Sequence, residues 1–410
     1  MAAVCDSDAE ALREAMVAQL RELGAIRSDQ VSDAFRAVPR HLFAPGEPLE
    51  TVYAPTRAIV TKRNTHGAAI SSLSESHIQA TMLEQAQLGP GMRVLEIGSG
   101  GYNAALIAEL VGESGRVVSV DIDPEIVDRA RACLAAAGYH RVNVVVADAE
   151  GGVPEYAPYD RIIVTVGAWD IPPAWLDQLS EGGRLVVPLR MRGLTRSVAF
   201  ERDGDHLVSR DYRLCGFVPM QGVGAHLERL VALDGGDVVL RVDEQQQIDA
   251  DRLRDALFGP RVECWSGVVF DHVDELDLWL ATAVPVFGIL AATDASIDRG
   301  LVARSATPRS ANRGVPTAVS GGSLAYRTKR PIEGANDFET GVYAHGPEAE
   351  ALAEEYVELL RTWDCEHRNG PGARIAVYPA ATPDEKLPTG RVIDKRHTRV
   401  VISWPGRRAP

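Results

Sequence analysis

The sequence lacks any cysteine pattern that would predict a disulfide framework or a zinc site. Its five cysteines are odd in number, lie far apart and never occur as Cys-x-x-Cys. Pairs of histidine or cysteine with the spacing of metal ligands are also missing, so we expect no metal. Scattered cysteines of this kind fit a reducing compartment, which predicts a cytoplasmic protein.

Basic charge and long apolar runs are scarce as well. The chain has 43 lysine and arginine residues against 57 aspartate and glutamate residues, a formal net charge of -14. A general nucleic-acid-binding protein would carry a basic footprint, so we expect no nucleic-acid partner. The most apolar stretch, residues 279–292, is short and broken by Pro285 and Gly288, so we expect no membrane span. The acidic start of the chain lacks the basic region and apolar core of a signal peptide.

What the sequence does contain is a series of short β-branched runs separated by helical segments. The runs are RVLEI, RVVSV, RVNVVVA, RIIVTV and RLVVPL, between residues 93 and 189. Apolar strands that alternate with helices predict a parallel sheet covered on both faces. The segment SVAFERDGDHLVSRDY then reads as a hairpin around Asp203-Gly204. We therefore predict an α/β fold, the Rossmann-like sheet of class I methyltransferases, which close their parallel sheet with an antiparallel pair.

The length of 410 residues suits two domains of unequal kind. The pattern of apolar runs and helical segments divides the chain into three parts. We predict an N-terminal helical segment and substrate loop over residues 1–90, and a cofactor-binding Rossmann-like domain over residues 91–215. Residues 216–410 mix helices with strands and predict a C-terminal α+β domain. The expected helices include residues 124–137, 250–258, 275–283 and 347–363.

A glycine-rich turn follows the first predicted strand, in VLEIGSGGYNAALIAEL. Glycines there let a ligand approach the backbone, and Asp121, at the end of the second strand, can accept both ribose hydroxyls. Glu96 precedes the glycines, and Asp148 follows the third strand. A dinucleotide site does not need the third acid, Asp148. In an S-adenosylmethionine site that acid can accept a hydrogen bond from the adenine amino group, so the three acids favour this cofactor. A helix or turn cap is the alternative for Asp148.

The residues expected to bind this cofactor share a position at the ends of these strands. They are Glu96, Gly98, Ser99, Gly100, Tyr102, Asp121, Ile122, Asp148 and Ala149.

Three segments within residues 10–215 carry a likeness to a known family. They are VSDAFRAVPRHLFAP, SLSESHIQATMLEQAQLGPGMRVLEIGSG and VPEYAPYDRIIVTVGAWDIPPAWLDQLSEGGRLVVP. Together they resemble the protein-L-isoaspartate O-methyltransferases. That family has Thr-Ile-Ser-Gln-Pro before the helix that leads to the cofactor strand, and the resemblance places its catalytic serine at Ser74. Two departures are a proline replaced by Ser76 and a glycine loop, Gly98 to Tyr102, that is one residue shorter.

The C-terminal part carries a second likeness. Its blocks WSGV, GGSLAYRT, VYAHGP and LPTGRVIDKRHTRVVISWP resemble the longer actinobacterial methyltransferases of the FxLD system. The resemblance implies a ribosomally made precursor peptide as substrate, modified by lanthipeptide or graspetide biosynthesis and macrocyclic. Methylation of an aspartate would give an ester that closes to an aspartimide, which can open to isoaspartate. The product of the cofactor would be S-adenosylhomocysteine.

Carboxyl methylation needs position rather than a base. An aspartyl carboxylate has a pKa of about 3.9 and is already ionised at neutral pH. Ser74 and Ser72 are the predicted catalytic residues, as hydrogen-bond donors that aim the carboxylate. A serine at the start of a helix is also an ordinary N-cap, and the two roles are compatible.

The predicted substrate-binding residues lie beside these serines, after the fourth strand and near the C-terminus. They are Ser71, Ser76, His77, Val166, Arg396 and Arg399. For His77 the commoner interpretation is an exposed helix histidine. The two arginines lie in a charged run before a strand. We predict that they form the wall of a groove that binds an acidic peptide, because arginine pairs with carboxylates; the alternative is that they lie on a solvated hairpin face.

The leading hypothesis is therefore an S-adenosylmethionine-dependent methyltransferase that modifies an aspartate of such a precursor. The alternative is a repair enzyme that acts on isoaspartate in aged proteins, with the second domain giving stability or oligomerisation. A tRNA methyltransferase can share this sheet, but the acidic charge opposes it. A cofactor-binding adaptor without catalysis is the fourth possibility, and the sequence indicates no oligomeric state.

Overall fold

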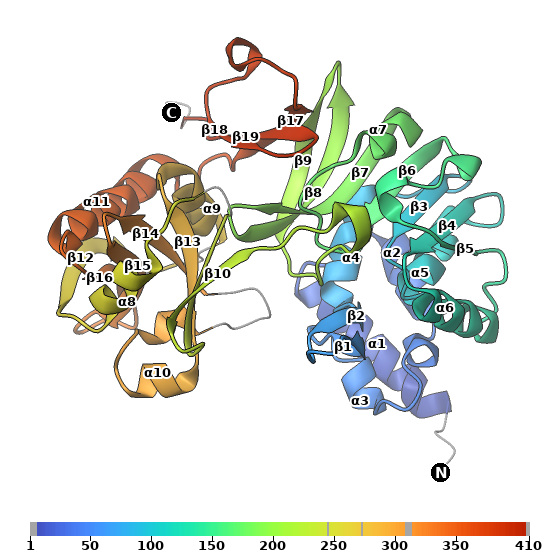
Figure 1. Ribbon diagram of the computed structural model, residues 1–410. Helices are drawn as coiled ribbons and strands as arrows, with labels where there is room; N and C mark the ends of the chain where they lie inside the picture. Colours follow the sequence, from blue (N-terminus) through green and yellow to red (C-terminus); the bar gives the residue numbers. More distant parts are fainter. Residues whose placement is uncertain (1–5, 244–245, 272–273, 308–313, 407–410) are drawn as a thin grey trace. The chain divides into compact units, whose positions relative to one another are not determined.

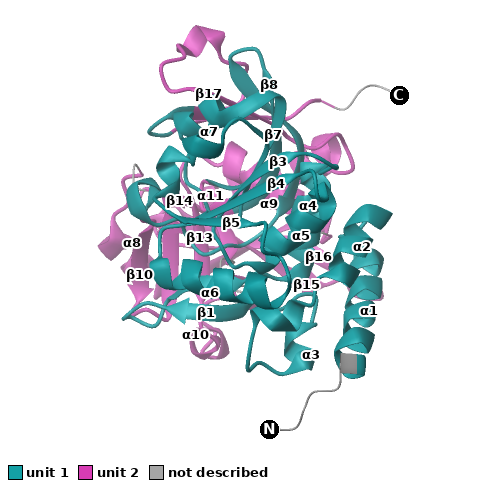
Figure 2. Cartoon of the chain, turned by 90° about the vertical axis from the view of Figure 1, so that its right-hand side faces the viewer, with its two compact units in different colours: residues 1–190, 195–226, 395–398 teal, residues 191–194, 227–394, 399–410 magenta. Residues whose placement is uncertain are grey.

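The computed structural model describes residues 6–406 except 244–245, 272–273 and 308–313. These residues divide into two compact units, drawn in two colours in Figure 2. The first unit comprises residues 1–190, 195–226 and 395–398, and the second comprises residues 191–194, 227–394 and 399–410. The functions assigned above to three parts of the chain stay predictions.

The first unit contains the predicted sheet, with strand order β9-β8-β7-β6-β3-β4-β5 (Figure 1). Neighbouring strands from β7 to β5 run parallel, and β8 and β9 form the expected antiparallel hairpin. This confirms the predicted fold class, an α/β class I methyltransferase sheet. The strands are β3 (Arg93–Ile97), β4 (Arg116–Asp121), β5 (Asn143–Val146), β6 (Tyr159–Val164), β7 (Leu179–Met191), β8 (Leu194–Asp203) and β9 (His206–Leu214).

Helices cover this sheet and share its apolar core. The side chains of Leu20, Phe35, Leu83 and Leu106, from four different helices, are almost completely buried in one cluster. The local sequence fixes where two of the helices start. The side chain of Ser28 caps α2 by accepting the N–H of Val31, and α6 has proline in its first position. The helices of this unit are α1 (Asp6–Glu22), α2 (Asp29–Ala37), α3 (Leu49–Val52), α4 (Ser76–Ala86), α5 (Tyr102–Val111), α6 (Pro124–Ala136) and α7 (Pro173–Gln178).

A separate antiparallel hairpin precedes α4. It consists of β1 (Ile59–Arg63) and β2 (Ala69–Leu73), which pair through a register that shifts twice. The sequence of this region alternates poorly in polarity and did not predict strands. The hairpin matters for function because β2 carries two of the candidate serines, Ser71 and Ser72.

The second unit has its own antiparallel sheet, with strand order β10-β11-β13-β14-β15-β16-β12. Its strands are β10 (Arg229–Asp234), β11 (Val238–Val242), β12 (Arg261–Val269), β13 (Phe287–Ala292), β14 (Val315–Ser320), β15 (Ser323–Pro331) and β16 (Phe338–His345). Three further strands pair in the order β18-β19-β17, namely β17 (Arg374–Pro379), β18 (Arg391–Asp394) and β19 (Thr398–Ser403).

The helices described among these strands are α8 (Ala250–Leu257), α9 (Asp274–Ala283), α10 (Asp294–Asp298) and α11 (Ala349–Thr362). In α11, Leu352, Tyr356 and Leu360 recur at helical spacing and are buried in the core of the unit. The four helices predicted above begin and end within two residues of α6, α8, α9 and α11, which confirms them. None of the helices in the described ranges has both the length and the apolarity that a bilayer crossing requires.

Candidate active site

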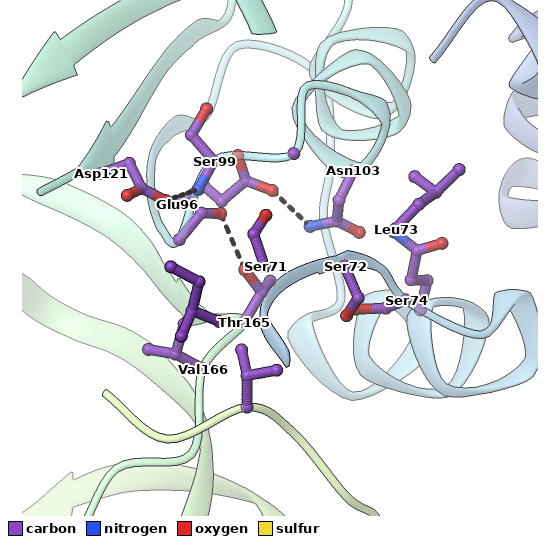
Figure 3. Close-up of a pocket in the computed structure, with 15 residues that line it drawn as sticks. Ser71, Ser72, Leu73, Ser74, Glu96, Ser99, Asn103, Asp121, Thr165 and Val166 are labelled. Atoms are coloured by element: carbon purple, nitrogen blue, oxygen red, sulfur yellow. Dashed lines mark hydrogen bonds between the residues drawn. The ribbon is translucent and has the colours of Figure 1, made fainter. Parts of the chain in front are cut away.

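A pocket opens in the first unit at the carboxyl ends of β3, β4 and β6. The chain runs from β3 outward to β5 and then crosses back to β6, so the pocket lies where the direction of winding reverses, the usual ligand site of such sheets. Figure 3 shows the residues around it. Its lining comprises Ile70, Ser71, Ser72, Leu73, Ser74, Gln79, Glu96, Gly98, Ser99, Gly100, Asn103, Asp121, Thr165, Val166 and Val218.

The glycine turn after β3 keeps the pocket open to a ligand. Gly98 has φ +94°, and a Cβ there would lie 2.7 Å from Oγ1 of Thr165. Gly101 has φ +82°, and a Cβ there would lie 3.1 Å from the ring of Phe43. The hydroxyl of Thr165 donates to the carbonyl oxygens of Ile97, at 3.0 Å, and Gly98, at 2.8 Å. Although one residue shorter than expected, the loop still forms a tight turn that only glycine fits.

Glu96 is a completely buried carboxylate at the wall of this pocket. The side-chain amide of Asn103 donates to it at 2.9 Å, and the hydroxyl of Ser119 donates to its other oxygen. Burial raises the pKa of Glu96 to about 7, because the charged form loses water, and the two hydrogen bonds oppose that effect. Glu96 can therefore gain or lose a proton near neutral pH.

Asp121 ends β4 on the same side of the pocket. Its two oxygens accept the backbone N–H groups of Ser99 and Asp123, each at 3.0 Å. Burial raises the pKa of Asp121, against the effect of these bonds. The ammonium of Lys62, from β1, lies 2.6 Å from the carboxylate of Asp123 and lowers the pKa of that group. The strand that leads to the candidate serines is thus tied to the loop that carries Asp121.

Asp148 does not line the pocket, because other parts of the chain use its carboxylate. One oxygen accepts the N–H of Glu150 at 3.0 Å and caps a short 3-10 helix, η2 (Ala149–Gly151). The other accepts the N–H of Val223 at 2.8 Å. The capping alternative is therefore observed, and a contact of Asp148 with adenine stays a prediction. The neighbouring candidates differ: Ala149 is buried, whereas Ile122 is 37% exposed.

Three of the candidate serines face the pocket. Ser71, Ser72 and Ser74 all line it, and the Ser71 hydroxyl lies 2.9 Å from that of Thr61. The buried guanidinium of Arg40 donates to the carbonyl oxygen of Ser74 at 2.7 Å, so this turn of the chain is held from behind. Figure 3 shows Ser72, which lies in β2, and Ser74, which lies between β2 and α4, with Glu96 and Asp121 on the strand side.

Ser74 is not the N-cap of α4, because that position belongs to Glu75. The capping alternative for Ser74 is therefore wrong. Its hydroxyl remains a candidate donor toward a ligand in the pocket.

Several predicted residues lie away from the pocket, which corrects the sequence interpretation. Ser76 is fully buried at the start of α4, where no substrate can reach its side chain. His77 is half-buried rather than exposed; its ring nitrogen lies 3.2 Å from the Glu75 carboxylate, and its backbone N–H donates to Pro55. Tyr102 is fully buried too, so its side chain belongs to the core. The rings of Phe35 and Phe43 contact it edge-on.

The two C-terminal arginines have different surroundings. Arg396 is 63% exposed and lies 3.9 Å from the carboxylate of Glu150. Arg399 is 15% exposed and lies 2.6 Å from both Asp384 and Asp394. Its guanidinium is already paired with two carboxylates, which leaves little capacity for an acidic peptide. Arg396 keeps that capacity, and its role in substrate binding stays a prediction.

The sequence interpretation missed several residues of the site. Asn103 is a buried amide in the first turn of the apolar helix α5, and that polar exception was its only signal. Thr165 directly precedes Val166, which was predicted, and locks the glycine turn. Arg40 and Lys62 act through contacts with residues more than thirty positions away, and such contacts leave no local pattern.

Among the described residues, no group of three histidine, cysteine, aspartate or glutamate side chains could hold a metal ion.

Comparison with known proteins gives a consistent result. Residues 11–224 match the family model described as protein-L-isoaspartate(D-aspartate) O-methyltransferase. The chain is 40% identical over 213 residues to a protein-L-isoaspartate O-methyltransferase from Methanopyrus kandleri, which covers 51% of this chain and 91% of that relative.

Among solved structures, a protein-L-isoaspartate O-methyltransferase is similar with a TM-score of 0.48 and 25% identity, covering 85% of this chain and 93% of that one. A second, from Plasmodium falciparum and described as a complex with S-adenosyl-L-homocysteine, has a TM-score of 0.44 and 18% identity. It covers 51% of this chain and 98% of that one.

Proposed function

The chain belongs to the protein-L-isoaspartate(D-aspartate) O-methyltransferase family, and from this premise we propose that it methylates the free α-carboxylate of isoaspartyl residues in proteins and peptides. It is an S-adenosylmethionine-dependent carboxyl O-methyltransferase. The observation that carries the proposal is a single pocket lined by the acids Glu96 and Asp121 and by the hydroxyls of Ser72 and Ser74. A methyl donor and a carboxylate acceptor need these two kinds of group side by side.

The residues around the glycine turn fit S-adenosylmethionine. Gly98 and Gly101 keep free the space that a Cβ would fill. Asp121 would accept the ribose hydroxyls, and the Glu96 carboxylate would face the positively charged end of the molecule. When bound, the cofactor supplies a methyl group on a sulfonium, which is electrophilic without a metal or a redox step.

On the acceptor side, the protein needs to orient rather than activate. The isoaspartyl carboxylate is ionised at neutral pH, so no general base is required. Hydroxyl groups of Ser72 and Ser74 would donate to it and point one oxygen at the methyl carbon. Such orientation of two reactants can lower a barrier by roughly 7 to 11 kcal/mol.

A second candidate function is the methylation of an aspartate in a ribosomally made precursor peptide of the lanthipeptide or graspetide type. Its support is the part of the chain after residue 226, which lies outside the matched residues 11–224 and carries the blocks that resemble the FxLD class. In that reaction the ester carbonyl is attacked by the next backbone nitrogen. Methanol leaves, and the aspartimide that forms can hydrolyse to isoaspartate.

One experiment separates the two functions. The full chain is incubated with labelled S-adenosylmethionine and either form of one linear peptide, aspartyl or isoaspartyl, and with a cyclised precursor peptide. We expect the isoaspartyl peptide to be methylated with a kcat/KM at least 100-fold above that of its aspartyl twin. Methylation of the cyclised precursor alone, followed by loss of methanol, would contradict this and support the second candidate. No transfer to any of the three would exclude both.

A further inference from the structure

Four residues from late in the chain are built into the first unit. After His226 the chain forms the second unit, and residues 395–398 then return to the first. They lie outside the family-matched range, 11–224. We call residues 395–398 the return segment, and its contacts with the methyltransferase sheet are all within the first unit.

The return segment is anchored by Lys395. The ammonium donates to the carbonyl oxygen of Arg190, at 2.6 Å, and to that of Trp169. It also lies 4.4 Å from the centre of the Trp169 ring. The ring of Trp169 is also stacked with the ring of His226, and the two ring centres are 3.8 Å apart. Lysine is rare in this chain, and this one is fully engaged.

His397 and Thr398 contact two carboxylates. The backbone N–H of His397 donates to Asp170 at 2.6 Å, and the Thr398 hydroxyl donates to the other oxygen of Asp170. The Nε2 atom of His397 lies 2.9 Å from the carboxylate of Glu150. The return segment therefore joins the loop after β5, through Glu150, to the loop after β6, through Asp170.

The loop after β5 carries Asp148, the predicted adenine contact, and the loop after β6 lines the pocket. Glu150 lies in η2, and its own N–H donates to Asp148. A Cβ on Gly224 would lie 2.9 Å from the Glu150 carboxylate, so the segment that donates to Asp148 through Val223 packs there too. Asp170 is four positions after Val166, which lines the pocket. Three segments therefore meet at the carboxylate of Glu150: η2, residues 222–224 and the return segment.

We propose that His397 is a positioning residue of the cofactor site: by bonding Glu150 it fixes η2 and, with it, the Asp148 carboxylate. The proposal rests on the proposed function, since the ligand is S-adenosylmethionine or its product. The proposal gives the return segment a role of its own, which is to hold the cofactor site in place. This segment lies outside the matched part of the chain and is translated after most of the second unit.

The test measures binding of S-adenosylhomocysteine to the full chain by isothermal titration calorimetry, so it needs no acceptor. We expect H397A to raise the Kd about five-fold with little change in Tm. H397Q places an amide donor where Nε2 was and should stay within about two-fold of wild type. The control is H206A. His206 has the same exposure, 21% against 22%, and also lies beside a carboxylate, that of Asp205, but it begins β9, and neither residue lines the pocket.

A second pair of variants gives the test an independent arm. E150A removes the partner from the methyltransferase side, and we expect it to raise the Kd as H397A does. The double variant should be no weaker than either single variant, because both remove one interaction. The proposal is overturned if H397A binds S-adenosylhomocysteine as tightly as H206A does; E150A takes its place if H397A does not fold. It is also overturned if H397Q fails to restore binding, or if the effects of H397A and E150A on the Kd add in the double variant. A wild-type chain that does not bind at all would instead refute the proposed function.

Discussion

At the scale of single residues, Glu96 is the side chain with the clearest electrostatic consequence. Its pKa in the folded protein is about 7, above the ordinary 4.5, because it is completely buried. Between these two values the native state holds a proton that the unfolded chain has released. The contribution of Glu96 to stability is therefore complete below pH 4.5 and declines as the pH rises to about 7.

This sign gives a direct prediction for E96Q. Glutamine is neutral at every pH, so the variant should gain stability relative to wild type between pH 5 and pH 8, by roughly 3 kcal/mol at most. Urea unfolding at the two pH values measures the difference. Removal of an exposed carboxylate of the same unit, in E113Q, serves as the control and should leave the pH profile unchanged. An E96Q profile parallel to wild type would refute the raised pKa.

The serines before α4 give a second prediction at this scale. S74A removes a hydroxyl that lines the pocket, and we expect kcat/KM for an isoaspartyl peptide to fall about 10- to 100-fold, the usual effect of a lost bond to a charged group. The affinity for S-adenosylhomocysteine should not change.

S76A is the matched control. The Ser76 hydroxyl is buried without a hydrogen-bond partner among the described residues, so its removal should leave activity intact. Equal losses in the two variants would mean that both substitutions act through α4 rather than through the pocket.

These residues also show what a motif can predict. The pattern of strands, glycines and acids identified Glu96 and Asp121, and the resemblance identified Ser74, with Ser72 beside it; all four line the pocket. Neither the pattern nor the resemblance could give side-chain direction. Tyr102 follows the glycines in the sequence, yet its ring is buried in the hydrophobic core rather than in the pocket. The reason is that α5, which Tyr102 begins, is buried on nearly every face.

At the scale of elements, contacts of Lys62 and Arg129 join the β1–β2 hairpin to the N-terminal half of α6. Lys62 lies 2.6 Å from both Asp123 and Glu125, and the guanidinium of Arg129 donates to the Thr61 carbonyl at 3.5 Å. Asp123 is the N-cap of α6, two residues after Asp121. The ion pair thus links the strand pair that carries the serines to the loop on the cofactor side.

We expect K62M to loosen the hairpin. The KM for an isoaspartyl peptide should rise about three- to ten-fold, while kcat and Tm change little, because an ion pair near the surface contributes little to stability. Steady-state kinetics at low and high salt measure the effect. K62R should restore most of the affinity, and K386M, at an exposed lysine in the second unit, should have no effect. A K62M enzyme with wild-type KM would exclude this link.

Elements with a strong period were predictable, and the hairpin was not. Helix α6 was predicted within one residue because its N-cap, its first-turn proline and its apolar spacing agree. The β8–β9 pair follows from its turn residues in the same way. In β1 and β2 the register shifts twice, which breaks the alternation of exposed and buried positions that would have revealed them.

At the scale of the whole molecule, the fold class and the presence of a second structured unit followed from composition and pattern. The return segment did not. Residues 394–399 were interpreted as a solvated hairpin or a peptide-binding wall, whereas Lys395, His397 and Thr398 make buried or half-buried contacts with the first unit. Those partners lie more than 200 positions earlier in the chain. The periodicity of a single sequence reveals local structure and cannot reveal contacts over such a separation.

The return segment also fixes the order of events during synthesis. A ribosome adds about 5 to 20 residues per second, and roughly 170 residues separate His226 from Lys395. A nascent methyltransferase unit therefore waits about 9 to 34 s between the synthesis of His226 and that of the return segment. Throughout that interval Asp170 and Glu150 are without their late partners. Translation that stops within the second unit leaves them so permanently, so a truncated chain carries the whole matched family region but an unbraced cofactor site.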